Sequence, residues 1–153
     1  MIRFLFAATV LVATSAAHAA PEEIATAALK PETRSLIIRE MQAIAAAMGR
    51  IHTALVTGDH PVVAQEAEKI HASFVLSGEL TGAQRHEIHT RLPAGFIARD
   101  KAFHQLASRL AAAGTDEDPE LERFWYEEMT RACQECHARH AAGRFPGLGS
   151  PDS

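Results

Sequence analysis

The sequence predicts an all-α protein, an antiparallel up-down four-helix bundle. Apolar residues recur at helical spacing in four long segments, short connections join these segments, and no segment alternates apolar and polar residues like a β-strand. The chain is also rich in alanine, the strongest helix former. Its 153 residues allow one domain with a single core.

Residues 1–19 are interpreted as a secretory signal peptide. Arg3 is a short positive segment, residues 4–17 are apolar, and Ala17-His18-Ala19 has the small-x-small form of a cleavage site. The apolar run is shorter than the roughly 20 residues that cross a bilayer. We therefore expect a periplasmic protein without stable membrane insertion, whose folded domain comprises residues 20–145.

The first long helix is expected from Glu32 to Thr57, directly after Pro31. Gly58-Asp59 interrupts the pattern, and a second helix is expected from Pro61 to a stop at Ser77-Gly78. A histidine on the first stripe, His52, is expected to be buried or half-buried with a hydrogen-bond partner. The two apolar stripes are Ile37, Met41, Ile44, Met48, Ile51, His52 and Leu55, and Val63, Ala67, Ile70 and Phe74.

A short helical turn is expected within residues 80–93, because Thr81 and Gln84 have the spacing of a capping box. A third long helix is expected over residues 95–113, with Gly114 as its C-terminal stop. The buried stripe of this third helix consists of Phe96, Phe103, Ala107, Leu110 and Ala111.

The fourth long helix follows an acidic connection. Asp118 is placed to cap this helix, Pro119 to occupy its first position, and Gly143 to lie near its end. Residues 146–153 are expected to form a flexible tail, because they are rich in Gly and Pro. The core stripe of the fourth helix consists of Leu121, Trp125, Met129 and Ala132.

The fourth helix carries the only two cysteines of the chain, in the run Cys133-Gln134-Glu135-Cys136-His137. This Cys-x-x-Cys-His spacing is the one by which c-type haem is attached. Each thiol can add to one haem vinyl group, and the adjacent imidazole is close enough to become an axial iron ligand. On a helix, Cys133, Cys136 and His137 share an arc of about 100°. The sequence therefore predicts one covalently bound haem c on the last helix.

Three other interpretations of the cysteine pair are open: a structural disulfide, a thioredoxin-like redox pair, and half of a zinc site. A redox pair normally lies near a βαβ pattern, which this sequence lacks. A zinc site needs two further Cys or His ligands from elsewhere in the chain. A haem-free bundle of any of these kinds would show no Soret absorption.

The chain resembles the class II c-type cytochromes, the group that contains cytochrome c′ and its low-spin relatives. The resemblance covers the whole mature chain: a signal peptide, a long first helix, and the haem motif near the C-terminus, whereas class I cytochromes usually carry it near the N-terminus. His140 and Ala141 depart from the family, which commonly has an aromatic and a basic residue there. The resemblance implies a protein without enzymatic activity, an electron carrier or a gas binder.

The resemblance also implies a distal residue on the first helix. When Met48-Gly49-Arg50-Ile51 is aligned with the family's apolar-Gly-basic-apolar run, Met41 occupies the distal position. A methionine there implies a six-coordinate iron that carries single electrons, with a reduction potential raised by His/Met ligation. The alternative is a five-coordinate iron that binds NO or CO. Periodicity alone favours Met41 as a flexible core residue.

Asp100 and His104 lie four residues apart on the third helix, where side chains meet. We interpret Asp100 as a carboxylate in the first helical turn, favoured by the helix dipole, and the other interpretation is a polar contact to haem or to an axial ligand. The remaining histidines are expected at the surface or boundary; they are His60, His71, His86 and His89. A secondary metal site formed by His86 and His89 stays an open alternative.

The expected partners are redox proteins. The formal net charge is −4 and no basic patch gathers along the chain, so nucleic acid is not expected to bind. The resemblance adds a homodimer as a further option, because family members often pair through their first two helices.

Overall fold

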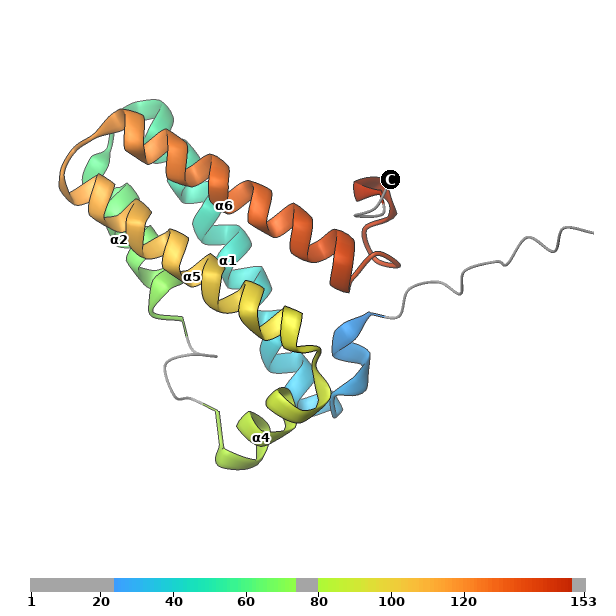
Figure 1. Cartoon of the computed structure of the whole chain (residues 1–153). Coiled ribbons are helices and arrows are strands. Elements are labelled where there is room, and N and C mark those ends of the chain that lie inside the picture. The colour runs from blue at the N-terminus through green and yellow to red at the C-terminus, as the bar shows by residue number, and fades with distance from the viewer. Residues whose placement is uncertain (1–23, 74–79, 150–153) are drawn as a thin grey trace, which may run out of the picture.

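The computed structural model describes residues 24–73 and 80–149 (Figure 1). This described part is all-helical and contains no β-strand, which confirms the predicted all-α class. None of its helices is long and apolar enough to cross a membrane. The predicted signal peptide, Phe74, the stop at Ser77-Gly78 and the last four residues of the predicted tail lie outside the described residues.

The first two long helices are α1 (Pro31–Thr57) and α2 (His60–His71). Gly58 ends α1 in the left-handed conformation, with φ 71°, and Asp59 caps α2 by accepting a hydrogen bond from the Val62 amide at 3.3 Å. The sequence predicts a longer second helix, but α2 already ends at His71. The chain then turns toward α1, where the Ser73 hydroxyl donates to the buried Glu40 carboxylate at 2.6 Å.

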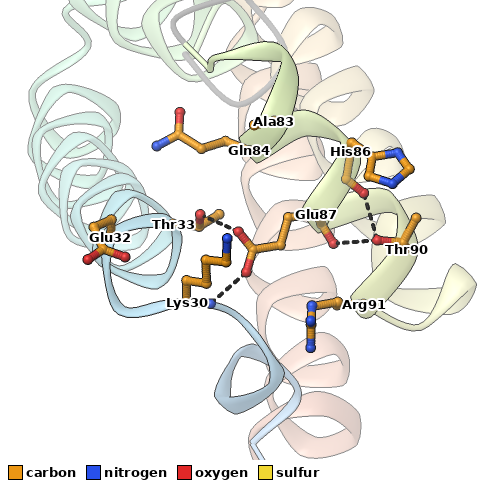
Figure 2. Close-up of a pocket in the computed structure, with 9 residues that line it drawn as sticks. All are labelled: Lys30, Glu32, Thr33, Ala83, Gln84, His86, Glu87, Thr90 and Arg91. Atoms are coloured by element: carbon orange, nitrogen blue, oxygen red, sulfur yellow. Dashed lines mark hydrogen bonds between the residues drawn. The ribbon is translucent and has the colours of Figure 1, made fainter.

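The short helix α4 (Gly82–Arg91) begins with the predicted capping box of Thr81 and Gln84. Its buried residue Glu87 reaches across to the start of α1, where the carboxylate accepts from the Lys30 amide at 2.7 Å and the Thr33 hydroxyl at 2.8 Å (Figure 2). These two donors hold the pKa of Glu87 below its ordinary value. A carboxylate of α4 thus satisfies amide and hydroxyl donors at the N-terminus of α1.

The third long helix, α5 (Ala94–Thr115), does not stop at Gly114 as predicted. Gly114 is a buried helical residue that lies against α2, and a Cβ atom at this position would be 2.7 Å from the Ala64 nitrogen. The glycine is therefore required for close approach between α5 and α2. The left-handed residue after the helix is Glu117, with φ 53°.

The last long helix is α6 (Pro119–His140), capped by the Asp118 carboxylate, which accepts from the amides of residues 120 and 121 at 3.0 Å each. It ends before the predicted Gly143, because Ala141 leaves the helical conformation with φ −147°. On its predicted core stripe Met129 is fully buried and Trp125 and Ala132 are half-buried.

The prediction for the remaining stripe residue, Leu121, is wrong, because its exposure is 45%. Leu121 lies eight residues before Met129, which places it about 80° around the helix from the most buried position. Leu121 also belongs to the first turn of α6, at the end of the packed region.

The core is built mainly around α5, which packs along both α2 and α6, while α1 packs along α2. By contrast, α1 and α6 approach each other at only a few positions. The colour gradient in Figure 1 shows that these two helices run in opposite directions. The buried apolar residues of the main cluster are Ile44, Ala47, Ile51, Ala54, Val63, Ala67, Ile70, Phe103, Ala107, Leu110, Ala111 and Met129.

Candidate haem site

The three residues of the predicted attachment motif lie on the C-terminal half of α6. Cys133, Cys136 and His137 are each half-buried, and both cysteines are free thiols. Cys133 packs against the main apolar cluster. The motif therefore lies at the edge of the core, where its side chains are neither sequestered nor fully solvated.

The two thiols differ from those of thiol–disulfide enzymes in their acidity. Burial and the neighbouring Cys136 raise the pKa of Cys133 to about 11. Burial and the nearby Asp100 carboxylate also raise the pKa of Cys136. Reactive redox cysteines instead have a lowered pKa, often at a helix N-terminus. This arrangement favours protonated thiols over a catalytic redox pair.

His137 has the protonation state that a metal ligand requires. Burial lowers the pKa of its imidazole, which favours the neutral form at neutral pH, and only the neutral ring has a free nitrogen lone pair. The imidazole stacks on the ring of Phe145, with centroids 4.3 Å apart and planes 12° from parallel.

Tyr126 identifies the side of α6 that faces α1. Its hydroxyl donates to the Met48 carbonyl at 3.4 Å, and its ring centroid lies 6.0 Å from that of His52. At 100° per residue, Cys133 and His137 each lie within about 20° of Tyr126 around α6. The same side of α6 therefore carries this contact to α1, the first thiol and the histidine.

Met41 lies on the matching side of α1. It is half-buried, and its direction around the helix differs by about 20° from those of Met48 and His52. Met41 precedes Met48 by seven residues and Cys133 follows Tyr126 by seven, about 10.5 Å along each axis. Both steps start at the Tyr126–Met48 contact. Because the helices run in opposite directions, the two steps lead toward the same end of the helix pair.

The residues present fit the predicted group. The Cys133 thiol and a neutral imidazole on α6 and a thioether on α1 belong to helix sides that share one contact region, and the helices themselves meet at few positions. Cys136 lies about 80° around α6 from Tyr126, toward Asp100 of α5. Ile38, one turn before Met41, is 44% exposed, so α1 also presents an uncovered apolar side chain near this level. A porphyrin needs both this donor set and apolar surroundings.

Two surface hollows are described in the structure, and neither is lined by Cys133 or Cys136. One of about 450 Å³ lies between the start of α1 and α4 (Figure 2), and one of about 380 Å³ lies along α1 and the start of α2. A haem site without its haem is expected to leave an apolar hollow beside the two cysteines, and neither of these two hollows is in that place.

Asp100 is not in the first turn of its helix, as the sequence predicts, because α5 begins six residues earlier, at Ala94. Its carboxylate lies 3.7 Å from Nε2 of the buried His104, whose Nδ1 is 2.7 Å from the Ile70 carbonyl. Burial lowers the pKa of His104, but Asp100 and the carbonyl outweigh it and the net shift is upward. Since Asp100 also acts on the Cys136 thiol, this pair lies close to the motif.

The prediction for His52 is wrong, because the side chain is exposed and its ring contact is to Tyr126. His60 and His71 are half-buried and His86 and His89 are exposed, as predicted. Within residues 24–73 and 80–149 no group of three or more His, Cys, Asp or Glu side chains could hold a metal ion. The described residues therefore supply no third ligand for a zinc site at the cysteines or for a site at His86 and His89.

Three features near the motif are missing from the sequence prediction. Tyr126 could have been found, because it lies two turns before Cys133 on one helix face. The ion pair between Arg99 and Glu135, at 3.1 Å, joins α5 to one of the two residues between the cysteines. The stacking of Phe145 depends on how the chain folds back after α6, for which the sequence gives no periodic signal.

Comparisons with known proteins found no relative of this chain: no family model matches, and no curated protein or solved structure matches.

Proposed function

We propose that this protein is a periplasmic monohaem c-type cytochrome that carries single electrons between redox proteins. In this proposal the four long helices form an antiparallel up-down bundle over residues 20–145. One haem c is linked through Cys133 and Cys136, with His137 and Met41 as axial ligands. The bound haem iron would supply the one-electron couple.

The observation that carries the proposal is the position of four ligand-type side chains around one helix pair. The motif spacing matches haem attachment, and the helix sides that carry Cys133, His137 and Met41 adjoin the Tyr126–Met48 contact, which supports the proposal. The raised pKa values of the thiols disfavour a redox pair. The resemblance to class II cytochromes points to the same function.

Each residue has a separate task in this proposal. The two thiols form the covalent links, and the uninterrupted helix α6 keeps them and His137 in fixed register. Burial keeps the His137 imidazole neutral, so that its lone pair is free. Met41 offers a soft thioether, which stabilises the reduced iron and raises the potential relative to two strong nitrogen donors.

The first test is expression of the whole chain together with a bacterial c-type haem maturation system. We expect a purified protein with Soret absorption and a haem that denaturation does not extract. Replacing Cys133 or Cys136 by Ser should each remove one thioether link, which the pyridine haemochrome spectrum reports. A wild-type protein without Soret absorption would refute the proposed function.

The second test separates electron transfer from gas binding by comparing two methionines on one side of α1. Met41→Ala should convert a low-spin spectrum to a high-spin one and open the iron to CO. Met48→Ala, a matched control at another half-buried position, should leave the low-spin spectrum unchanged. A wild type that is already high-spin and binds CO would support the five-coordinate alternative.

A further inference from the structure

The segment after α6 folds back onto the motif instead of leaving the molecule. The Phe145 amide lies 3.1 Å from the carbonyls of both Ala141 and Ala142, and the Arg144 amide donates to the Ala141 carbonyl at 2.8 Å. A short 3-10 helix, η2 (Pro146–Leu148), follows and packs on α6. Phe145 is thereby held at a fixed position relative to the last turn of α6.

This fold-back brings the Phe145 ring parallel to the His137 imidazole. The centroids are 4.3 Å apart and the planes differ by 12°. The Arg144 guanidinium lies 5.9 Å from the centroid of the Phe145 ring, so the ring also has a cationic neighbour. One face of the imidazole is therefore covered by an aromatic ring from a different segment.

Stacking and metal ligation use different parts of an imidazole. Stacking occupies the faces of the ring, whereas a metal is bound by the lone pair of a ring nitrogen, which lies in the ring plane. The two interactions can therefore coexist on His137. A stacked neighbour also restricts rotation of the ring about its bond to Cβ, and so fixes the plane in which the nitrogen points.

We propose that Phe145 is a positioning residue that sets the plane of the His137 imidazole as an axial ligand. This inference rests on the proposed haem function. It assigns a role to a residue that lies outside the motif and eight positions after its histidine. The interaction is local to the end of α6, so the variants below leave the buried apolar cluster intact.

The test uses Phe145→Ala, which removes the ring, and Phe145→Leu, which keeps apolar volume but not the planar stack. Phe145→Tyr retains the ring and is the rescue variant. The matched control is Phe124→Ala, because Phe124 is an exposed aromatic of α6 that contacts the Trp125 ring and not His137. Circular dichroism establishes that each variant has wild-type helix content.

In the protein without haem, NMR should show the His137 ring protons shifted upfield by the Phe145 ring current. This shift should be lost in the Ala and Leu variants and kept in the Tyr and Phe124→Ala variants. In the haem-loaded oxidised protein, the pattern of haem-methyl NMR shifts reports the orientation of the imidazole plane. This pattern should change in the Ala and Leu variants and return to the wild-type pattern in the Tyr variant.

Two outcomes overturn this role of Phe145. One is a His137 ring-current shift that persists without the phenyl ring, and the other is a haem-methyl pattern that survives both Phe145→Ala and Phe145→Leu. A wild-type chain that takes up no haem instead refutes the proposed function, and the role of Phe145 with it. The two failures are thus distinguished by whether the wild type is loaded.

Discussion

Replacing Gly114 by Ala tests the close approach of α5 to α2. The added Cβ would lie 2.7 Å from the Ala64 nitrogen and 3.0 Å from its Cα, and both are backbone atoms that cannot rotate away. Overpacking of this kind costs about 1–3 kcal/mol. The higher helix propensity of alanine offsets little of this cost, because Gly114 is the penultimate residue of α5. We expect Gly114→Ala to lower the free energy of unfolding by about 1–3 kcal/mol.

The matched control is Gly49→Ala in the interior of α1, where an added Cβ meets nothing within 4 Å. This change should raise stability by about 0.5–1 kcal/mol through helix propensity. Urea denaturation and the melting temperature measure both variants, with about 4 °C expected per kcal/mol for a domain of this size. A Gly114→Ala protein as stable as the Gly49→Ala protein would refute the inferred close approach.

Three further predictions concern charged groups. The pKa of His104 in the folded protein is raised above its ordinary 6.5, so protonated His104 stabilises the fold below pH 6.5 and this contribution is lost as the pH rises through the folded-state pKa. Asp100→Asn should flatten this pH dependence of the melting temperature. The Glu66 carboxylate, which Arg50 holds below its ordinary pKa of 4.5, stabilises the fold above pH 4.5 and loses that contribution in more acidic solution; Glu66→Gln should remove this acid-side loss, measured by urea denaturation across that range. Asp118→Ala removes the cap of α6 and should cost about 0.5–2 kcal/mol, visible as a lower melting temperature.

These three predictions have their own contrary outcomes. A pH dependence above 6.5 that is unchanged in Asp100→Asn would show that His104 does not depend on this carboxylate. Equal acid sensitivity of the wild type and Glu66→Gln would show that the Glu66 carboxylate is not coupled to Arg50 and Lys69. An Asp118→Ala protein with wild-type melting temperature would show that the amides it caps are satisfied by water.

Local signals in the sequence predict the helices well. Thr81 and Gln84 form the predicted capping box, Asp118 caps α6, and Gly58 ends α1, because each of these effects needs only a few neighbouring residues. Gly114 shows the limit of such reasoning. A glycine at a helix end has two physical uses, conformational freedom and small size, and only the packing of α2 distinguishes them.

The part of the candidate site that lies on one helix could be predicted from the spacing of its residues. Cys133, Cys136 and His137 share a helix arc because of their spacing, and the structure keeps them on one continuous helix. Periodicity could not decide the side-chain exposure of His52, which lies at the edge of its stripe beside Tyr126. It also could not find Phe145, because the turn after α6 brings that ring back to the motif.

The central place of α5 has a consequence for the candidate site, whose residues come from α6 and α1. Because α6 packs along α5 and meets α1 at few positions, the positions of Cys133 and Cys136 depend mainly on how α6 packs on α5. Changes at the α5–α6 boundary should move the attachment points as a unit. Changes on α1 should alter the side chains near Met41 with little effect on the positions of Cys133 and Cys136, because α1 and α6 meet at few positions.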